Sequence, residues 1–147
     1  RANDDDLTEA FGIAQEFAPD GNHGAMIRLG RMYRDGKGVE KDLDKAIEWM
    51  RKATKSGNKW IYIEFVDTLW RRKSPQDLQE AIVILTPLSK EGDPEAMERL
   101  SVAYYEGKGV NKNLDLAIEW MSKAVNQIPR LKSKLNEMIS SSDIYEA

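Results

Sequence analysis

Two stretches of the sequence, 71 residues apart, are near-copies of each other. Residues 25–39 read AMIRLGRMYRDGKGV, and residues 96–110 read AMERLSVAYYEGKGV. The same offset relates LDKAIEWMRKA at residues 43–53 to LDLAIEWMSKA at residues 114–124. Self-similarity at a fixed spacing is the mark of a repeat protein, and it predicts the architecture before any local propensity is considered.

A weaker copy lies between these two, at half the offset. Ala10, Ala46, Ala81 and Ala117 recur at spacings of 36, 35 and 36 residues, so the unit is about 36 residues long. The middle copy has lost the Gly-Lys-Gly-Val loop and is degenerate. We therefore predict a single domain over residues 1–147, made of a partial repeat (5–22), repeat 1 (23–58), degenerate repeat 2 (59–93), repeat 3 (94–128), and a capping helix with a tail (129–147).

Each unit has the pattern of two helices, here named helix A and helix B. In helix A, Ala25, Leu29 and Tyr33 are four residues apart and share one face. Gly36 and Gly38 then end the helix, because glycine tolerates a positive φ.

Helix B follows, with apolar residues from Leu43 to Ala53 on one face and Asp42 placed as its cap. Residues 5–18 have the pattern of a lone helix B. A closing helix A is indicated by Leu131, Leu135, Met138 and Ile139. The pattern therefore predicts eight helices, with fraying from about Ser140.

These elements together resemble the Sel1-like repeat family, relatives of the tetratricopeptide repeats. The shared pattern is Ala-x-x-x-Leu-Gly-x-x-Tyr-x-x-Gly-x-Gly-Val followed by Asp-x-x-x-Ala-x-x-Trp-x-x-x-Ala. Residues 25–53 match it in full, and residues 96–124 depart from it at Ser101 and Asn113. The resemblance implies an all-α fold, an α/α superhelix (solenoid) of about three Sel1-like helix pairs with a partial N-terminal repeat and a C-terminal capping helix.

The resemblance also implies a function. Family members are usually bacterial adaptors without chemistry of their own, so we expect a non-enzymatic scaffold that binds a peptide or helix of a partner protein. The alternative is an accessory docking or oligomerisation domain of a larger enzyme, for example in envelope-polysaccharide biosynthesis. Exported relatives carry cysteine pairs, and their absence here favours the cytoplasm. The chain begins with Arg1 rather than Met, so export stays open.

Composition excludes several other classes. The 147 residues carry a net charge of −3, which gives no positive field for nucleic acid, and no apolar run is long enough to enter a membrane. With no cysteine and one histidine, we predict no catalytic residue, no cofactor and no metal site. His23 is expected in a turn, Glu48 and Glu119 as scaffold positions, and Asp4, Asp5 and Asp6 at a helix start.

The remaining candidates for partner binding are residues of helix A that face away from helix B. They vary between repeats and bring Trp, Tyr and Arg, the commonest interface hot spots, onto the concave surface. This predicted strip consists of Ile27, Arg31, Arg34, Ile63, Asp67, Trp70, Glu98, Val102 and Tyr105. The alternative for Trp70 and Tyr105 is packing between neighbouring repeats.

Three further features are secondary candidates. Arg71, Arg72 and Lys73 form a basic cluster for which a solvated face is the favoured interpretation. Val83 replaces a surface residue and is expected to be an exposed apolar spot. The terminal helices, near Leu131, would also allow a weak homodimer.

Overall fold

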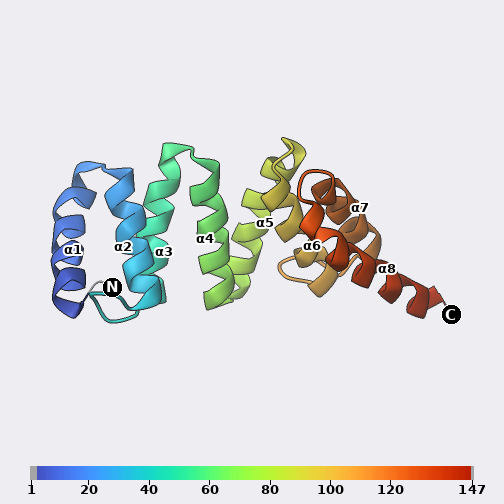
Figure 1. Ribbon diagram of the computed structural model, residues 1–147, viewed down its shortest axis with the longest axis horizontal. Coiled ribbons are helices and arrows are strands. Elements are labelled where there is room, and N and C mark those ends of the chain that lie inside the picture. Colours follow the sequence, from blue (N-terminus) through green and yellow to red (C-terminus); the bar gives the residue numbers. More distant parts are fainter. Residues whose placement is uncertain (1–2, 147) are drawn as a thin grey trace. The chain divides into compact units, whose positions relative to one another are not determined.

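The described part of the chain folds into eight consecutive α-helices. The computed structural model describes residues 3–146, and side chains as far as residue 143. No strand occurs in that part of the chain, where one helix follows another along the sequence (Figure 1). Their bounds are α1 Asp4–Phe17, α2 His23–Asp35, α3 Leu43–Ala53, α4 Lys59–Arg72, α5 Pro75–Lys90, α6 Pro94–Glu106, α7 Leu114–Val125 and α8 Lys132–Glu146.

The helices form two compact units. Unit 1 contains α1–α4, and unit 2 contains α5–α8, with the division between residues 72 and 73. This point lies inside the degenerate repeat, between its two helices. The predicted count of eight helices is confirmed, with α1 as the lone helix B and α8 as the closing helix A. Because α8 continues to Glu146, the expected fraying from about Ser140 is not seen, and Ala147 lies outside the described residues.

In unit 1, close packing of α2 on α3 depends on a small residue. Ala46, Ile47 and Met50 of α3 are fully buried. A Cβ atom added to Gly30 of α2 would lie 2.5 Å from Met50 Cγ, so only glycine permits this approach.

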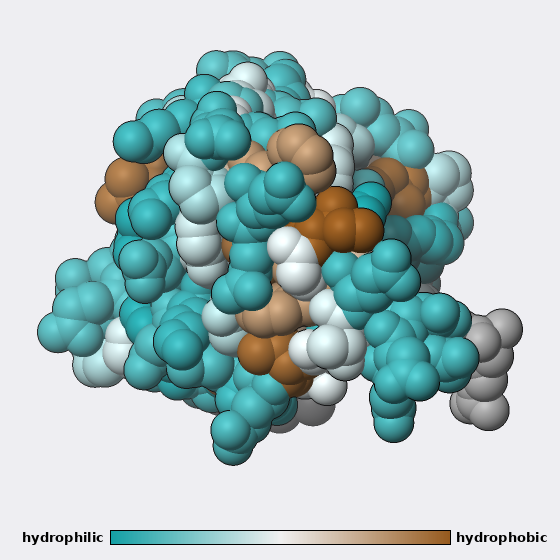
Figure 2. Space-filling view, turned by 90° about the vertical axis from the view of Figure 1, so that its left-hand side faces the viewer, coloured by the Kyte–Doolittle hydropathy of each residue, from teal (hydrophilic) through white to brown (hydrophobic). Residues whose placement is uncertain are grey.

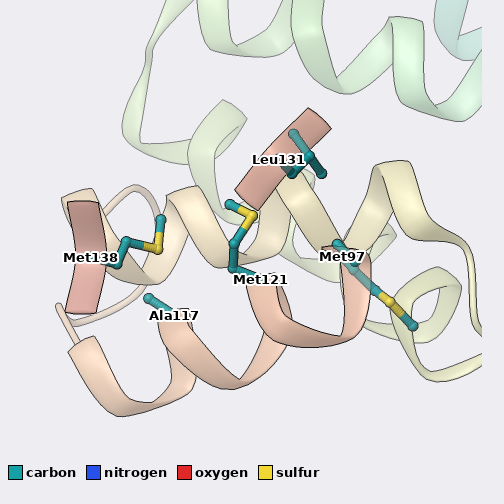
Figure 3. Packing of buried hydrophobic residues seen from close by; sticks show 6 residues of the cluster. Met97, Ala117, Met121, Leu131 and Met138 are labelled. Atoms are coloured by element: carbon teal, nitrogen blue, oxygen red, sulfur yellow. The ribbon is translucent and has the colours of Figure 1, made fainter. Parts of the chain in front are cut away.

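Unit 2 solves the same packing problem with a different residue. Ser101 of α6 occupies the Gly30 position, and its buried hydroxyl donates a hydrogen bond to the Ala117 carbonyl of α7. Around this contact, α6, α7 and α8 share one apolar core (Figure 3), in which Met121 of α7 and Met138 of α8 are buried. The departure at Ser101 therefore leaves the helix pair intact.

Local capping explains where the helices begin. The Asp42 side chain accepts a hydrogen bond from the Lys45 amide at the start of α3, and Asn113 accepts one from the Leu116 amide at the start of α7. Asn and Asp cap helices about equally well, which is why the second departure from the repeat pattern is tolerated.

The Gly-Lys-Gly loop of each intact repeat packs against helix B of the preceding repeat. Gly38 has a φ of 75° and lies against the backbone carbonyl of Leu7 in α1. Gly109, with the same φ, lies against the carbonyl of Leu78 in α5. The degenerate repeat has no such loop, and in unit 1 Arg72 instead pairs with Asp44 at the start of α3, at 2.9 Å.

Candidate interaction surface

The predicted strip has members in both units, and unit 1 contains six of them. Ile27 of α2 and Ile63 of α4 are buried, with 4% and 5% of their surface exposed. These two side chains, predicted on the side of helix A that faces away from helix B, are therefore not exposed on a concave surface. A helix A inside a stack has neighbours on several sides, so its apolar face is wider than the stripe that meets its own helix B.

Arg31 and Arg34 of α2 converge on Glu64 of α4. Arg31 donates two hydrogen bonds to the two carboxylate oxygens of Glu64, at 2.7 and 2.9 Å, and Arg34 donates a third at 3.0 Å. Arg34 also makes a two-point pair with Asp35, which accepts a further bond from Arg71 of α4. These five residues form what we call the arginine–carboxylate cluster, and it ties together successive A helices.

The cluster keeps its carboxylates charged. Burial raises the pKa of Glu64, but the hydrogen bonds and charges of Arg31 and Arg34 outweigh it, so the pKa lies below its ordinary value. Hydrogen bonding to Arg34 is the main reason that the pKa of Asp35 is lowered. In return, the bond to Glu64 raises the pKa of Arg31, and the bond to Asp35 raises the pKa of Arg34.

An exposed tryptophan lies beside this cluster. Trp60, in the first turn of α4, is 46% exposed, and the Arg31 guanidinium lies over its ring at 4.9 Å. Arg31 is 41% exposed at its side chain, whereas Arg34 is 16% exposed. Sequence reasoning missed Trp60 because the predicted strip begins one turn later, at Ile63, although Trp60 continues the same helical spacing.

The other two members of the strip in unit 1 are on α4. Asp67 and Trp70 are both half-buried, and both interact with other groups of the protein. Their part in partner binding stays a prediction.

In unit 2, α8 covers much of the predicted strip on α6. Glu98 pairs with Lys134 of α8 at 2.8 Å, and its side chain is only 13% exposed. Val102 packs against the apolar core. Tyr105 remains 37% exposed, and its hydroxyl lies 3.0 Å from the Ser141 hydroxyl. Tyr105 also lines a cleft of about 750 Å³ together with Glu106, Lys112, Leu114 and Ser141.

The two glutamates at equivalent repeat positions, Glu48 and Glu119, form ion pairs within their own helices. Glu48 pairs with Lys52 and Glu119 with Lys123, each one turn along its own helix, and each lysine also lies over a tryptophan ring. Because the same arrangement recurs in both units, it belongs to the repeat framework and not to a binding site.

The residues predicted at helix starts and in the basic stretch are likewise engaged in the fold. Asp6 completes a capping box with Asn3. His23 is the first residue of α2, so its expected place in a turn is wrong, because the helix is capped one residue earlier by Asn22. In the basic stretch, Arg71 and Arg72 are paired with Asp35 and Asp44. Val83 is 72% exposed, as predicted.

Two other kinds of feature are absent from the part of the chain that the structure describes. Among its residues, no cluster of three or more His, Asp or Glu residues has a geometry that could hold a metal ion. None of the helices between residues 3 and 146 combines the length and apolar character needed to cross a membrane.

Comparison with known proteins identifies two stretches that match a known repeat. The model of the Sel1 repeat family matches residues 23–58 and 94–127, which are the A/B pairs of repeats 1 and 3. A crystal structure of a Sel1 repeat protein from Oxalobacter formigenes superposes with a TM-score of 0.65 at 22% identity, covering 81% of this chain and 49% of that one. Residues 23–58 and 94–127 are thus similar to the Sel1 repeat. The predicted solenoid of Sel1-like helix pairs is thereby confirmed.

Two further proteins are similar to this chain. An uncharacterised protein of Neisseria meningitidis serogroup B is 29% identical over 113 residues, which are 77% of this chain and 23% of that protein. A protective antigen of uropathogenic Escherichia coli that displays an SLR fold has a TM-score of 0.36 at 21% identity, over 80% of this chain and 33% of its own. The chain therefore spans less than half the length of each of these proteins.

Proposed function

We propose that this chain is a non-enzymatic scaffold whose helix A surface binds a peptide or helix of another protein. Sel1 repeat proteins generally mediate protein–protein interaction. The observation that supports a site on this chain is the exposed Trp60 ring stacked under Arg31. Tryptophan and arginine are the residue types that contribute most to binding at interfaces.

The surroundings of Trp60 favour binding because they are already ordered. Arg31 is held by two hydrogen bonds to Glu64, so its guanidinium does not have to be immobilised when a partner binds. Ordering a long side chain costs about 0.5–1.5 kcal/mol on association, and this cost is reduced for a prearranged pair. Arg31 keeps part of its surface open for a partner's carboxylate or backbone carbonyl.

In unit 2 the corresponding candidate is the cleft beside Tyr105. It combines an exposed aromatic ring with an apolar residue, Leu114, and with Lys112 and Glu106 at its edge. This combination suits a peptide that inserts one apolar side chain and carries charges on either side. The strip members Glu98 and Val102 support the fold here, so we assign binding to Tyr105 and to the lining of the cleft.

The test is capture of partners by immobilised variants of the chain. We expect Trp60→Ala, Tyr105→Ala, or both together to lose partners that the unaltered chain retains, without a change in helical circular dichroism. Val83→Ala is the matched control, because Val83 is an exposed apolar residue on α5 outside both surfaces. If all three variants retain the same partners at the same level, the helix A surface is not the binding site.

A further inference from the structure

Arg31 of α2 keeps part of its hydrogen-bonding capacity free beside the exposed ring of Trp60. It donates its Nε and Nη2 groups to the two carboxylate oxygens of Glu64. The third nitrogen, Nη1, makes no hydrogen bond with any residue that the structure describes. Nη1 carries two N–H donors, and 41% of the side chain is exposed, so these donors are left for a molecule that binds at the surface.

The guanidinium of Arg31 is held in place by its neighbours. Glu64 binds two of its nitrogens, and its plane lies over the Trp60 ring at 4.9 Å. Glu64 is itself fixed by Arg34, which donates a hydrogen bond to it at 3.0 Å. A planar guanidinium fixed in this way loses little conformational freedom when its remaining nitrogen binds an acceptor.

The Trp60 ring offers an apolar surface next to that nitrogen. Seen from the α1 side, the molecule shows mainly hydrophilic side chains with apolar ones between them (Figure 2). Three aromatic rings, those of Phe17, Trp60 and Tyr105, are prominently exposed in the described part of the chain, and of these only Trp60 has a guanidinium stacked on it. The site therefore combines one apolar surface with one directed pair of N–H donors, and it lies on two internal helices, α2 and α4.

The charge of these two helices favours an acidic group at the site. Together α2 and α4 carry six lysines and arginines and three acidic residues, although the whole chain has a net charge of −3. Asp35 and Glu64 are bound to arginines, and Asp67 is half-buried and also engaged. Helix α6 has the opposite balance, with three acidic residues and one arginine. An acidic partner is therefore attracted to unit 1.

A carboxylate is the better of the two acceptors that Nη1 could meet on a protein. A backbone carbonyl is neutral, whereas a hydrogen bond between a guanidinium and a carboxylate joins two charged groups and is about twice as strong. Glu64 balances only one positive charge, and the excess positive charge of α2 and α4 is available to balance a second carboxylate.

We infer that this site binds a segment of a partner protein in which an acidic side chain lies beside an apolar one. The carboxylate accepts hydrogen bonds from Nη1 of Arg31, and the apolar side chain covers the exposed part of the Trp60 ring. Arg31 thus selects the partner by its charge, and Trp60 supplies the apolar contact. The inference rests on the proposed function, which it narrows from any peptide or helix to an acidic one.

Three capped synthetic peptides of equal length test this partner chemistry. All contain leucine at the same positions, and their variable positions are all glutamate, all glutamine or all lysine. Fluorescence anisotropy of each labelled peptide, titrated with the 147-residue chain, measures the affinity. We expect the glutamate peptide to bind about tenfold more tightly than the glutamine peptide, and the lysine peptide to bind most weakly. The tenfold ratio should approach one in about 1 M salt, where the Debye length falls to about 3 Å.

Variants of the two residues separate their parts. Arg31→Gln should reduce the affinity for the glutamate peptide to that for the glutamine peptide, and Arg31→Lys should recover only part of the difference, because lysine lacks the planar fork. In both variants Glu64 keeps its bond to Arg34. Trp60→Ala should weaken both peptides alike. Arg130→Gln, which removes an exposed arginine of unit 2, is the matched control and should change neither affinity. Circular dichroism verifies the fold of each variant.

Three results would overturn the inference. The first is a glutamate peptide that binds no more tightly than the glutamine peptide, or not at all. The second is an Arg31→Gln variant that still prefers the glutamate peptide by the same factor. The third is a single-stranded oligonucleotide that displaces the glutamate peptide and depends on Trp60, because this would assign the site to nucleic acid. In each case the proposed function survives if Trp60→Ala still loses captured partners, and it fails separately if that variant retains all of them.

Discussion

Replacing Gly38 by alanine should destabilise unit 1 because of a contact that the repeat pattern alone does not show. Two costs add up at this position. The backbone has a φ of 75°, at which an L-residue with a Cβ is strained by about 1–2 kcal/mol. The new Cβ would also overlap the carbonyl group of Leu7 at the start of α1, and backbone cannot rotate away as a side chain can. Overpacking of this kind costs about 1–3 kcal/mol.

Gly57 separates these two costs. It has the same φ of 75°, and nothing lies within 4 Å of the Cβ it would gain. Alanine also restricts the unfolded chain, which returns about 0.4–1 kcal/mol at either site. We therefore expect Gly57→Ala to lower the free energy of unfolding by about 1 kcal/mol or less, and Gly38→Ala to lower it by about 2–4 kcal/mol.

Urea titration followed by circular dichroism measures both values. The same comparison can be made in unit 2 with Gly109→Ala, which would overlap the Leu78 carbonyl, and Gly92→Ala, which is sterically open. Equal losses for Gly38→Ala and Gly57→Ala would refute the reasoning, because they would show that the loop does not need to approach α1 closely.

Two further predictions concern the arginine–carboxylate cluster. Glu64→Ala should lower the free energy of unfolding by about 1–3 kcal/mol in urea titration, because it leaves two arginines without their shared acceptor. Glu48→Ala is the control and should change it by less than about 0.5 kcal/mol, since Glu48 is exposed and pairs with Lys52 only at 3.7 Å. On acidification, the lowered pKa values of Glu64 and Asp35 mean that their contribution is fully present above the unfolded-state pKa values of about 4. This contribution to stability should be lost as the pH falls through the lower folded-state pKa values. Thermal melts of Glu64→Gln should show a shallower loss of stability over the same pH range. An unchanged dependence of the melting temperature on pH would show that Glu64 is not its cause.

The helices themselves could be predicted from the sequence, because what defines them is local. Apolar spacing of three and four residues places Leu29 and Tyr33 on one face whatever lies beyond it. Capping by Asp42 and Asn113 involves only backbone groups within three residues. The 71-residue repeat then implied that two such helix pairs would have the same structure.

The exposure and the partners of the helix A side chains could not be predicted in the same way. Ile27 and Ile63 share the helix surface opposite Leu29, and no local pattern indicates that neighbouring helices bury them. Arg31 and Arg34 were correctly placed on helix A, but their engagement with Glu64 depends on a residue 30 or more positions away. Trp60 escaped notice because the exposure of a ring depends on its three-dimensional neighbours and not on its spacing.

By itself, the amino-acid sequence determined the period, the helices and the turns between them, since all of these follow from interactions within a few residues or from self-similarity. The tertiary structure alone decided which polar side chains of helix A serve the fold and which face solvent. The physical reason is that burial is a property of packed neighbours, and a repeat pattern says which face is apolar without saying what covers it.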